Sequence, residues 1–184
     1  LWSEKVGEDI LIMSDGDVYV NKDVVRKIPK EFEDQKVGCV VGEPVSLNSR
    51  KDKFGYWSHL FFAGINKTRK KFSDEERFFE ASGYLFAIRN GIIKKFPLET
   101  SEDSVIPYLI WRKGYKIRYT DAKVYVLNPS NWKDFLNQKI RNIKSHENLG
   151  KMFPSLPRTK SLFNEIKEGG LFALKFPKNI KEFI

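Results

Sequence analysis

Two acidic residues flank a glycine just after a short apolar run, a pattern that could hold a divalent cation. The run Ile10 to Met13 ends at Ser14, and Asp15-Gly16-Asp17 follows. A short run of branched residues that stops at a turn signal predicts a buried strand. Ligands of open α/β sheets bind beyond the carboxyl ends of the strands, and carboxylate oxygens there suit Mg²⁺ or Mn²⁺. Asp and Gly are also ordinary turn formers, so Asp15 and Asp17 are candidate metal ligands only.

A second acidic pair, Glu102-Asp103, could supply a general base. The pair precedes Val105 to Ile110, whose apolar residues have helical spacing, and Gly114 is expected to end the helix. Pro107 is placed in the first turn or so, where its missing N–H matters least. Acidic residues also stabilise a helix start through the macrodipole alone, without catalysis. Glu102 and Asp103 are therefore candidate catalytic residues, and Asp103 lies nearer the apolar stripe.

Two polar pairs are candidate substrate-binding residues. Ser82 and Gly83 lie inside a predicted strand from Phe79 to Ile88, and a glycine within a strand marks a bulge, the close approach of a ligand, or a packing adjustment. Gln138 and Arg141 are three residues apart and so share one face of a predicted helix. A solvated polar edge is the alternative interpretation of that face.

The elements that must position these residues predict an α/β fold. Further strands are expected at Val37 to Val41, Lys116 to Tyr119 and Lys123 to Leu127, with helices between them. Pro129-Ser130 opens a longer helix. Its apolar stripe consists of Trp132, Phe135, Leu136, Ile140 and Ile143.

An aromatic-rich segment from Phe54 to Asn66 also has helical periodicity. Its residues Trp57, Leu60, Phe61 and Ile65 fall on one helical face. This face is expected to pack into the core, and a surface on which a ligand stacks is the alternative. The basic run Lys67 to Lys71 that follows predicts a solvated loop, or a loop that orders over a substrate.

Composition and charge narrow the class of protein. The 184 residues carry a net charge of +9, which favours a nucleotide, a nucleic acid or an acidic lipid surface as partner. The lysines are spread along the chain and no nucleic-acid motif occurs, which argues against nucleic acid. A single cysteine, Cys39, excludes a disulfide framework. No apolar run is long enough to span a bilayer, so we expect a cytoplasmic protein, in solution or at the cytoplasmic face of a membrane.

The chain changes character after Gly150. Residues 1–150 are expected to form the main domain and residues 151–184 a basic, amphipathic tail in which Leu, Phe and Ile alternate with Lys. Such a tail either lies on a membrane surface or packs on the domain.

The order of these motifs resembles the family 2 glycosyltransferases, in the branch of the hyaluronan, chitin and cellulose synthases. The resemblance covers residues 7–145 and rests on Asp15-Gly16-Asp17, Ser82-Gly83, Thr100-Ser101-Glu102-Asp103 and Gln138-Lys139-Ile140-Arg141. The third motif has one residue more than the Thr-Glu-Asp of the family. Asn142 replaces the tryptophan that follows the family's Gln-x-x-Arg, which argues against processive polymer synthesis.

The resemblance implies a GT-A-like mixed sheet flanked by helices, without the amino-terminal nucleotide-binding strands. By this likeness the chain is the carboxyl-terminal portion of such an enzyme or a diverged short member. Asp15 and Asp17 would bind the Mn²⁺ or Mg²⁺ of a nucleotide-sugar donor, Glu102-Asp103 would hold the base, and Gln138 and Arg141 would contact the donor diphosphate and acceptor. The implied reaction is transfer of a sugar, with inversion, to a hydroxyl of a glycan or a lipid-linked acceptor, with peripheral membrane contact.

Two other functions are alternatives to sugar transfer. A metal-dependent nucleotidyl or phosphoryl transferase on a similar sheet would need the Asp pair but not an acceptor base at Asp103. A non-catalytic module that binds anions or a membrane would need only the positive charge, and its binding would depend steeply on salt and not on chelators.

Overall fold

The computed structural model describes residues 9–94, 101–155, 157, 172 and 175–178. In chain order these residues form β1 (Ile10–Met13), β2 (Tyr19–Val20), α1 (Val24–Glu31), β3 (Val37–Ser46), α2 (Lys53–Asp74), β4 (Phe86–Arg89), α3 (Glu102–Arg112), β5 (Lys116–Val126) and α4 (Trp132–Met152). The mixed α/β class expected from the sequence is therefore confirmed. The predicted boundary near residue 150 falls at the end of α4, and most of the predicted tail lies outside the described residues.

The described strands form one curled, mixed sheet in the order β1-β4-β3-β5-β2. Strand β4 runs antiparallel to both β1 and β3, while β3 and β5 are parallel. The carboxyl ends of β1, β3 and β5 consequently point to the same edge of the sheet. This edge is where a ligand site was expected, because Asp15 lies two residues beyond the end of β1.

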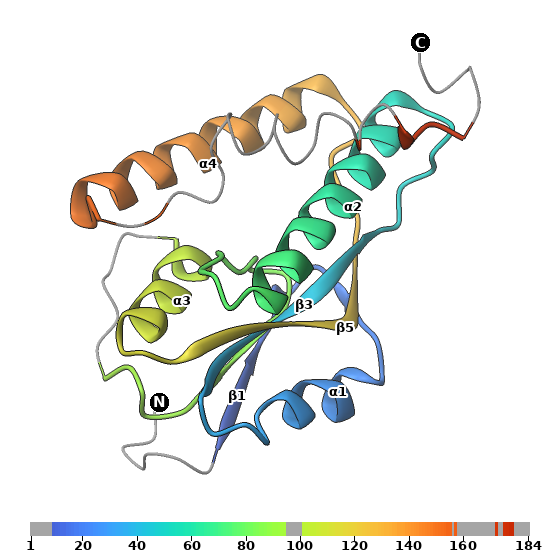
Figure 1. The fold of residues 1–184 in the computed structure, drawn as a ribbon. Helices are drawn as coiled ribbons and strands as arrows, with labels where there is room; N and C mark the ends of the chain where they lie inside the picture. Colours follow the sequence, from blue (N-terminus) through green and yellow to red (C-terminus); the bar gives the residue numbers. More distant parts are fainter. Residues whose placement is uncertain (1–8, 95–100, 156, 158–171, 173–174, 179–184) are drawn as a thin grey trace.

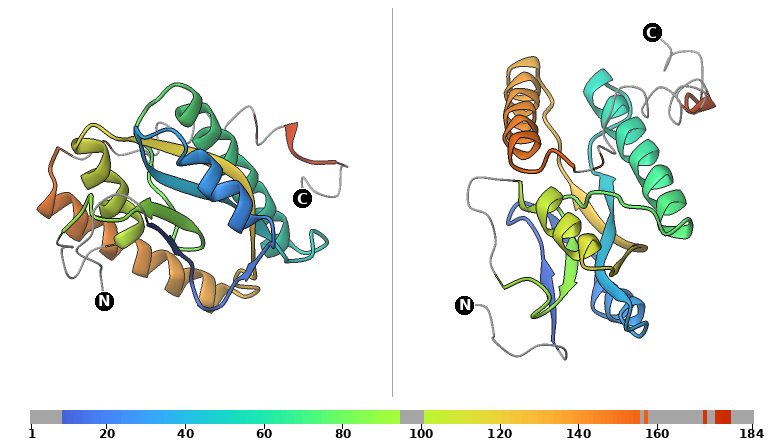
Figure 2. Two further views of the ribbon diagram at one scale, coloured as in Figure 1. Left: turned by 90° about the horizontal axis from the view of Figure 1, so that it is seen from below. Right: turned by 60° about the vertical axis from the view of Figure 1, so that its left-hand side comes forward.

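Helices cover both faces of the sheet. Helix α1 lies on one face, and α2, α3 and α4 lie on the other (Figures 1 and 2). The alternation of side chains along the strands produces two cores. Cys39 and Val41 of β3 pack in the larger core, whereas Val40 packs in the smaller one beneath α1. The larger core includes residues of α2, α3 and α4, so it fixes the helices that surround the predicted site.

Helix α2 is longer than the sequence analysis predicted. It continues through Lys67 to Lys71, which was expected to be a loop, and ends at Asp74. The segment contains no proline, and its Lys and Arg side chains favour a helix. The buried face also differs from the predicted one: Phe54, Phe62 and Phe72 are buried, whereas Trp57 and Phe61 are 38% and 50% exposed. The prediction of the core-facing side was therefore wrong.

Two strand predictions also need correction. Residues 79–85 are not part of a strand, so Ser82 and Gly83 lie in the turn that leads into β4. The two predicted strands after Gly114 form one strand, β5, with an irregularity opposite Val41 and Glu43 of β3. Gly114 itself has φ of +85° just after α3, the left-handed conformation that commonly ends a helix.

Helix α4 crosses over the same face of the sheet as α2 and α3 (Figure 1). Asn131 caps it, since its side chain accepts a hydrogen bond from the Asp134 N–H. The rings of Trp132 and Phe135 pack against Phe54 and Trp57 of α2 at centroid distances of 5.3 to 6.1 Å. No helix in the part of the chain that the structure describes has the length and apolar character needed to cross a membrane.

Candidate functional site

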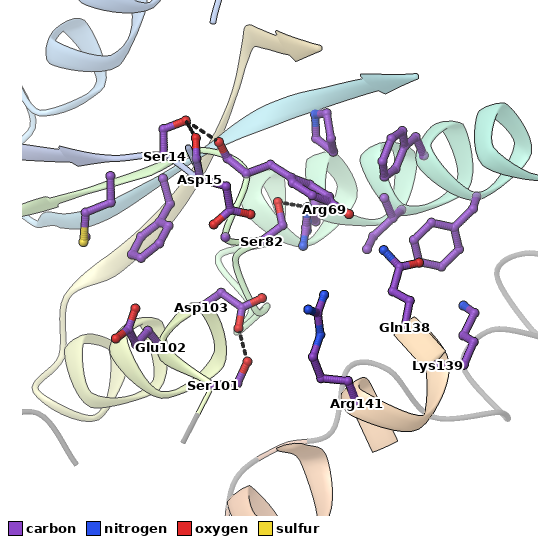
Figure 3. A pocket seen from close by; sticks show the side chains of 18 of the residues that line it. Ser14, Asp15, Arg69, Ser82, Ser101, Glu102, Asp103, Gln138, Lys139 and Arg141 are labelled. Carbon is purple, nitrogen blue, oxygen red and sulfur yellow. Dashed lines mark hydrogen bonds between the residues drawn. The ribbon is translucent and has the colours of Figure 1, made fainter. Parts of the chain in front are cut away.

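A pocket of about 940 Å³ opens where β1, the turn before β4, α2, α3 and α4 come together (Figure 3). The residues with polar side chains that line it are Ser14, Asp15, Arg69, Ser82, Tyr84, Ser101, Glu102, Asp103, Gln138, Lys139 and Arg141. Seven of the eight predicted site residues are therefore brought to one cavity from four separate segments. The eighth, Asp17, is exposed and lies outside the lining.

The turn before β4 contacts Ser14 and Asp15 through hydrogen bonds and a close approach of its backbone. The Asp15 N–H donates to the carbonyl oxygen of Gly83 over 3.1 Å, and the Ser14 hydroxyl donates to the carbonyl oxygen of Tyr84 over 2.9 Å. A Cβ atom on Gly83 would lie only 3.1 and 3.2 Å from the carboxylate oxygens of Asp15. A side chain at this position would require the Asp15 carboxylate to shift by a few tenths of an ångström, so Gly83 lets the carboxylate approach the backbone closely.

The start of α3 is tied to the same turn through the backbone of Asp103. Pro107 lies six residues into α3, further than predicted, and it has no N–H to donate to the carbonyl of Asp103 four residues earlier. That carbonyl instead accepts the Ala81 N–H over 2.9 Å. The Ser101 hydroxyl donates to the Asp103 carboxylate. Because Pro107 cannot donate to it, the Asp103 carbonyl is available to accept the Ala81 N–H. This hydrogen bond joins the start of α3 to the segment that contacts Asp15.

Arg69 is a pocket residue that the sequence analysis missed. It is 3% exposed, and its guanidinium donates to the carbonyl oxygens of Glu80 over 3.1 Å and Ala81 over 2.6 Å. Burial lowers the pKa of Arg69, while the nearby carboxylates of Asp103 and Glu80 raise it. The available signal was spacing: Phe62, Arg69 and Phe72 lie seven and three residues apart, which places them on one helical face.

Arg141 and Gln138 reach the pocket from α4. Arg141 is exposed and Gln138 is partly buried, and Figure 3 shows Arg141 directed toward the region between Asp103 and Arg69. Arg141 is close enough to lower the pKa of Asp15. The carboxylate of Glu102 points away from this region in Figure 3, although Glu102 also lines the pocket.

Negative charge accumulates around Asp15. Its pKa is raised from the ordinary value of 3.8, mainly by partial burial and then by repulsion from Asp17, Asp103 and Glu102. A bound cation would relieve this repulsion, so the donor set fits Mn²⁺ or Mg²⁺. The described residues contain no group of three or more His, Cys, Asp or Glu side chains arranged around one point. Asp15 and Asp17 would therefore leave coordination positions for oxygens of a substrate.

Replacing Asp15 with Asn is expected to stabilise the protein at neutral pH. With its folded pKa above 3.8, Asp15 binds a proton more readily in the folded state, so its charge destabilises the fold progressively as the pH rises from 3.8 through the folded pKa. Asn has no charge, so the Tm of Asp15→Asn should exceed that of the original protein at pH 7. The difference should shrink as the pH falls toward 3.8 and disappear about one pH unit below it, where both states are protonated. A Tm difference that is equal at pH 7 and pH 3.5 would show that charge is not the cause.

This arrangement can bind an anionic ligand and accept a proton beside it. Arg141 supplies a fork of donors suited to phosphate oxygens, and Asp103 supplies a carboxylate held by Ser101. The apolar part of the lining, which includes Phe61, Ile65 and Ile143, continues from these polar groups.

Neither a scan against protein-family models nor a search of curated proteins finds a match to this chain.

Proposed function

We propose that this chain is the catalytic portion of a metal-dependent glycosyltransferase of GT-A-like fold. It moves a sugar from a nucleotide-sugar donor to an acceptor hydroxyl, with inversion at the sugar carbon. The observation that supports this most is the shared pocket of Asp15, Asp103 and Arg141, which offers a cation ligand, a base and a phosphate clamp. The motif order described above is the second support.

Each group has a separate task in the proposed reaction. Arg141 and Gln138 bind the donor diphosphate, and Asp15 and Asp17 are the residues that would hold Mn²⁺ or Mg²⁺. The cation, when bound, supplies positive charge that stabilises the departing diphosphate. The acceptor oxygen forms a bond to the anomeric carbon as the bond from that carbon to the diphosphate oxygen breaks. Asp103 takes the proton of the acceptor hydroxyl, and the nucleoside diphosphate leaves with the bonding electrons.

Cation binding tests the donor half of this proposal. Two carboxylates cannot close a coordination shell, so calorimetry should detect weak Mn²⁺ binding to the protein alone and tighter binding when a nucleoside diphosphate is present. Asp15→Ala should abolish the enhancement. Asp74→Ala, which removes an exposed carboxylate that does not line the pocket, should leave Mn²⁺ binding unchanged.

The same experiment separates the alternatives. Identical Mn²⁺ binding by Asp15→Ala and the unaltered protein would contradict the site. Binding of nucleotides that is insensitive to chelators and falls steeply with salt would favour an anion-binding module. Transfer of the nucleotidyl group to an acceptor, with release of sugar 1-phosphate instead of nucleoside diphosphate, would favour a nucleotidyl transferase.

A further inference from the structure

Helices α2 and α4 carry an exposed surface of large apolar side chains. We call it the apolar face, and it consists of Trp57 and Phe61 of α2 with Trp132, Leu136, Ile140 and Ile143 of α4, each between 38% and 60% exposed. The two helices meet within it, because the rings of Trp57 and Trp132 are 5.7 Å apart. An exposed stretch of this kind is unusual for a surface that contacts only water.

Most of the apolar face of α4 is directed away from the side that carries the pocket residues Gln138 and Arg141. At about 100° per residue, Trp132, Leu136, Ile140 and Ile143 fall within an arc of about 80°. Arg141 lies about 100° beyond Ile140, the nearest edge of this arc. The other edge of the arc is Trp132, and the buried residue Leu149 lies about 100° beyond that edge. The core residue Leu149 and the pocket residues Gln138 and Arg141 therefore lie outside the arc, and Ile143 is the α4 residue that belongs to both the apolar face and the pocket lining.

Lysines border the apolar face. Lys133 and Lys144 are exposed and lie within about 40° of Ile140 around the helix. On the opposite border, the Lys139 ammonium lies 5.1 Å from the ring centre of Phe61. Tryptophan and lysine beside aliphatic residues are the combination found where a protein rests on a lipid surface. Glu147 lies within the arc nearer the C-terminal end and limits the face to the first three turns of α4.

We propose that the apolar face docks on an anionic lipid membrane. Its aromatic and aliphatic side chains enter the interface, and the bordering lysines contact acidic head groups. The charge also distinguishes this partner from a second copy of the chain, because joining two apolar faces would bring lysines of like charge together. The sequence analysis placed membrane contact in residues 151–184, whereas the surface suited to it among the described residues belongs to α2 and α4.

Docking would also set the position of the pocket. Phe61 and Ile143 belong to the apolar face and line the pocket, so the cavity opens beside the membrane surface. If the proposed function holds, on which this step rests, the acceptor is an amphiphile. Its apolar part lies along Phe61, Ile65 and Ile143, and its hydroxyl reaches Asp103.

Vesicle binding tests the docking without nucleotide or cation. The full chain should co-sediment with vesicles that mix phosphatidylglycerol with phosphatidylcholine, and much less with phosphatidylcholine alone. Ile140→Asp should weaken the partition coefficient at least about tenfold, because a charge replaces an inserted side chain. Lys133→Glu combined with Lys144→Glu should weaken binding by about tenfold or more through reversed charge. The matched control is Val25→Asp, since Val25 is 74% exposed on α1, on the other face of the sheet.

Three results would overturn the docking proposal. These are absence of co-sedimentation, equal binding by Ile140→Asp and Val25→Asp, and a dimer in solution that Ile140→Asp dissociates. Circular dichroism of each variant separates lost binding from lost folding. Because the assay contains neither Mn²⁺ nor nucleotide, its failure leaves the catalytic proposal standing, and failure of the Mn²⁺ experiment leaves the docking standing.

Discussion

Replacing Asp103 with Asn is expected to lower the rate of sugar transfer by about 10²–10⁴, the usual cost of removing a positioned general base. Donor affinity should survive, because the groups assigned to the diphosphate, Arg141 and Gln138, are unchanged. Asn keeps the shape of the side chain and can still contact Ser101. The loss should therefore appear in kcat and not in the Kd of the nucleotide sugar.

Glu102→Gln is the matched control for Asp103→Asn. The two residues are neighbours in the first turn of α3, and both line the pocket. Only Asp103 is directed toward Arg141 and Ser82, and its backbone is held by Ala81 (Figure 3). Glu102→Gln should keep most of the activity.

The measurement is release of nucleoside diphosphate together with transfer of labelled sugar, alongside donor binding by calorimetry. An inactive Glu102→Gln with a normal Asp103→Asn would show that the base was assigned to the wrong residue. Equal loss in both variants, with donor binding also lost, would show that the pair only shapes the pocket.

The sequence was most informative where chemistry and local structure coincide. Asp15 could be placed at the end of a strand because the apolar run before it stops at a turn signal, and α3 could be predicted from the spacing of Val105 to Ile110. Both signals lie within about ten residues, so no tertiary information was needed to interpret them.

The sequence was least informative where burial decides the outcome. Periodicity placed Trp57 and Phe61 on the core side of α2, but the alternative face with Phe54 and Phe62 packs inside. Both faces of α2 carry aromatic residues, so hydrophobicity alone could not choose between them. A charged residue among lysines likewise suggests a solvated loop, and the spacing of Arg69 from Phe62 and Phe72 becomes informative only once the helix is known to continue through this run.

Replacing Arg69 with Met is expected to lower the free energy of unfolding by about 3 kcal/mol. The buried carbonyl oxygens of Glu80 and Ala81 would lose charged donors at 3.1 and 2.6 Å, and each unsatisfied buried group costs about 1–3 kcal/mol. Methionine fills much of the same volume, so the loss reflects hydrogen bonds and charge more than a cavity. Urea unfolding measures the change directly.

Arg69→Lys and Lys70→Met are the comparison variants for Arg69→Met. Lysine restores the positive charge near Asp103 and Glu80 but not the planar fork that reaches two carbonyls, so it should recover only part of the stability. Lys70 is the exposed neighbour of Arg69 on α2, and its replacement should change stability by less than about 0.5 kcal/mol. If Arg69→Met unfolds at the same urea concentration as Lys70→Met, the guanidinium contributes nothing net to the fold.

Arg69 also connects stability with the proposed site. The carbonyl oxygens that accept hydrogen bonds from Arg69 belong to the segment before β4. In this segment the Ala81 N–H donates to the Asp103 carbonyl, and Gly83 lies against Asp15 and accepts a hydrogen bond from its N–H. Releasing that segment in Arg69→Lys should weaken the Mn²⁺ binding enhanced by nucleotide even where the chain remains folded. A folded Arg69→Lys with unchanged Mn²⁺ binding would mean that Asp15 keeps its position without the clamp, and that Arg69 serves the core alone.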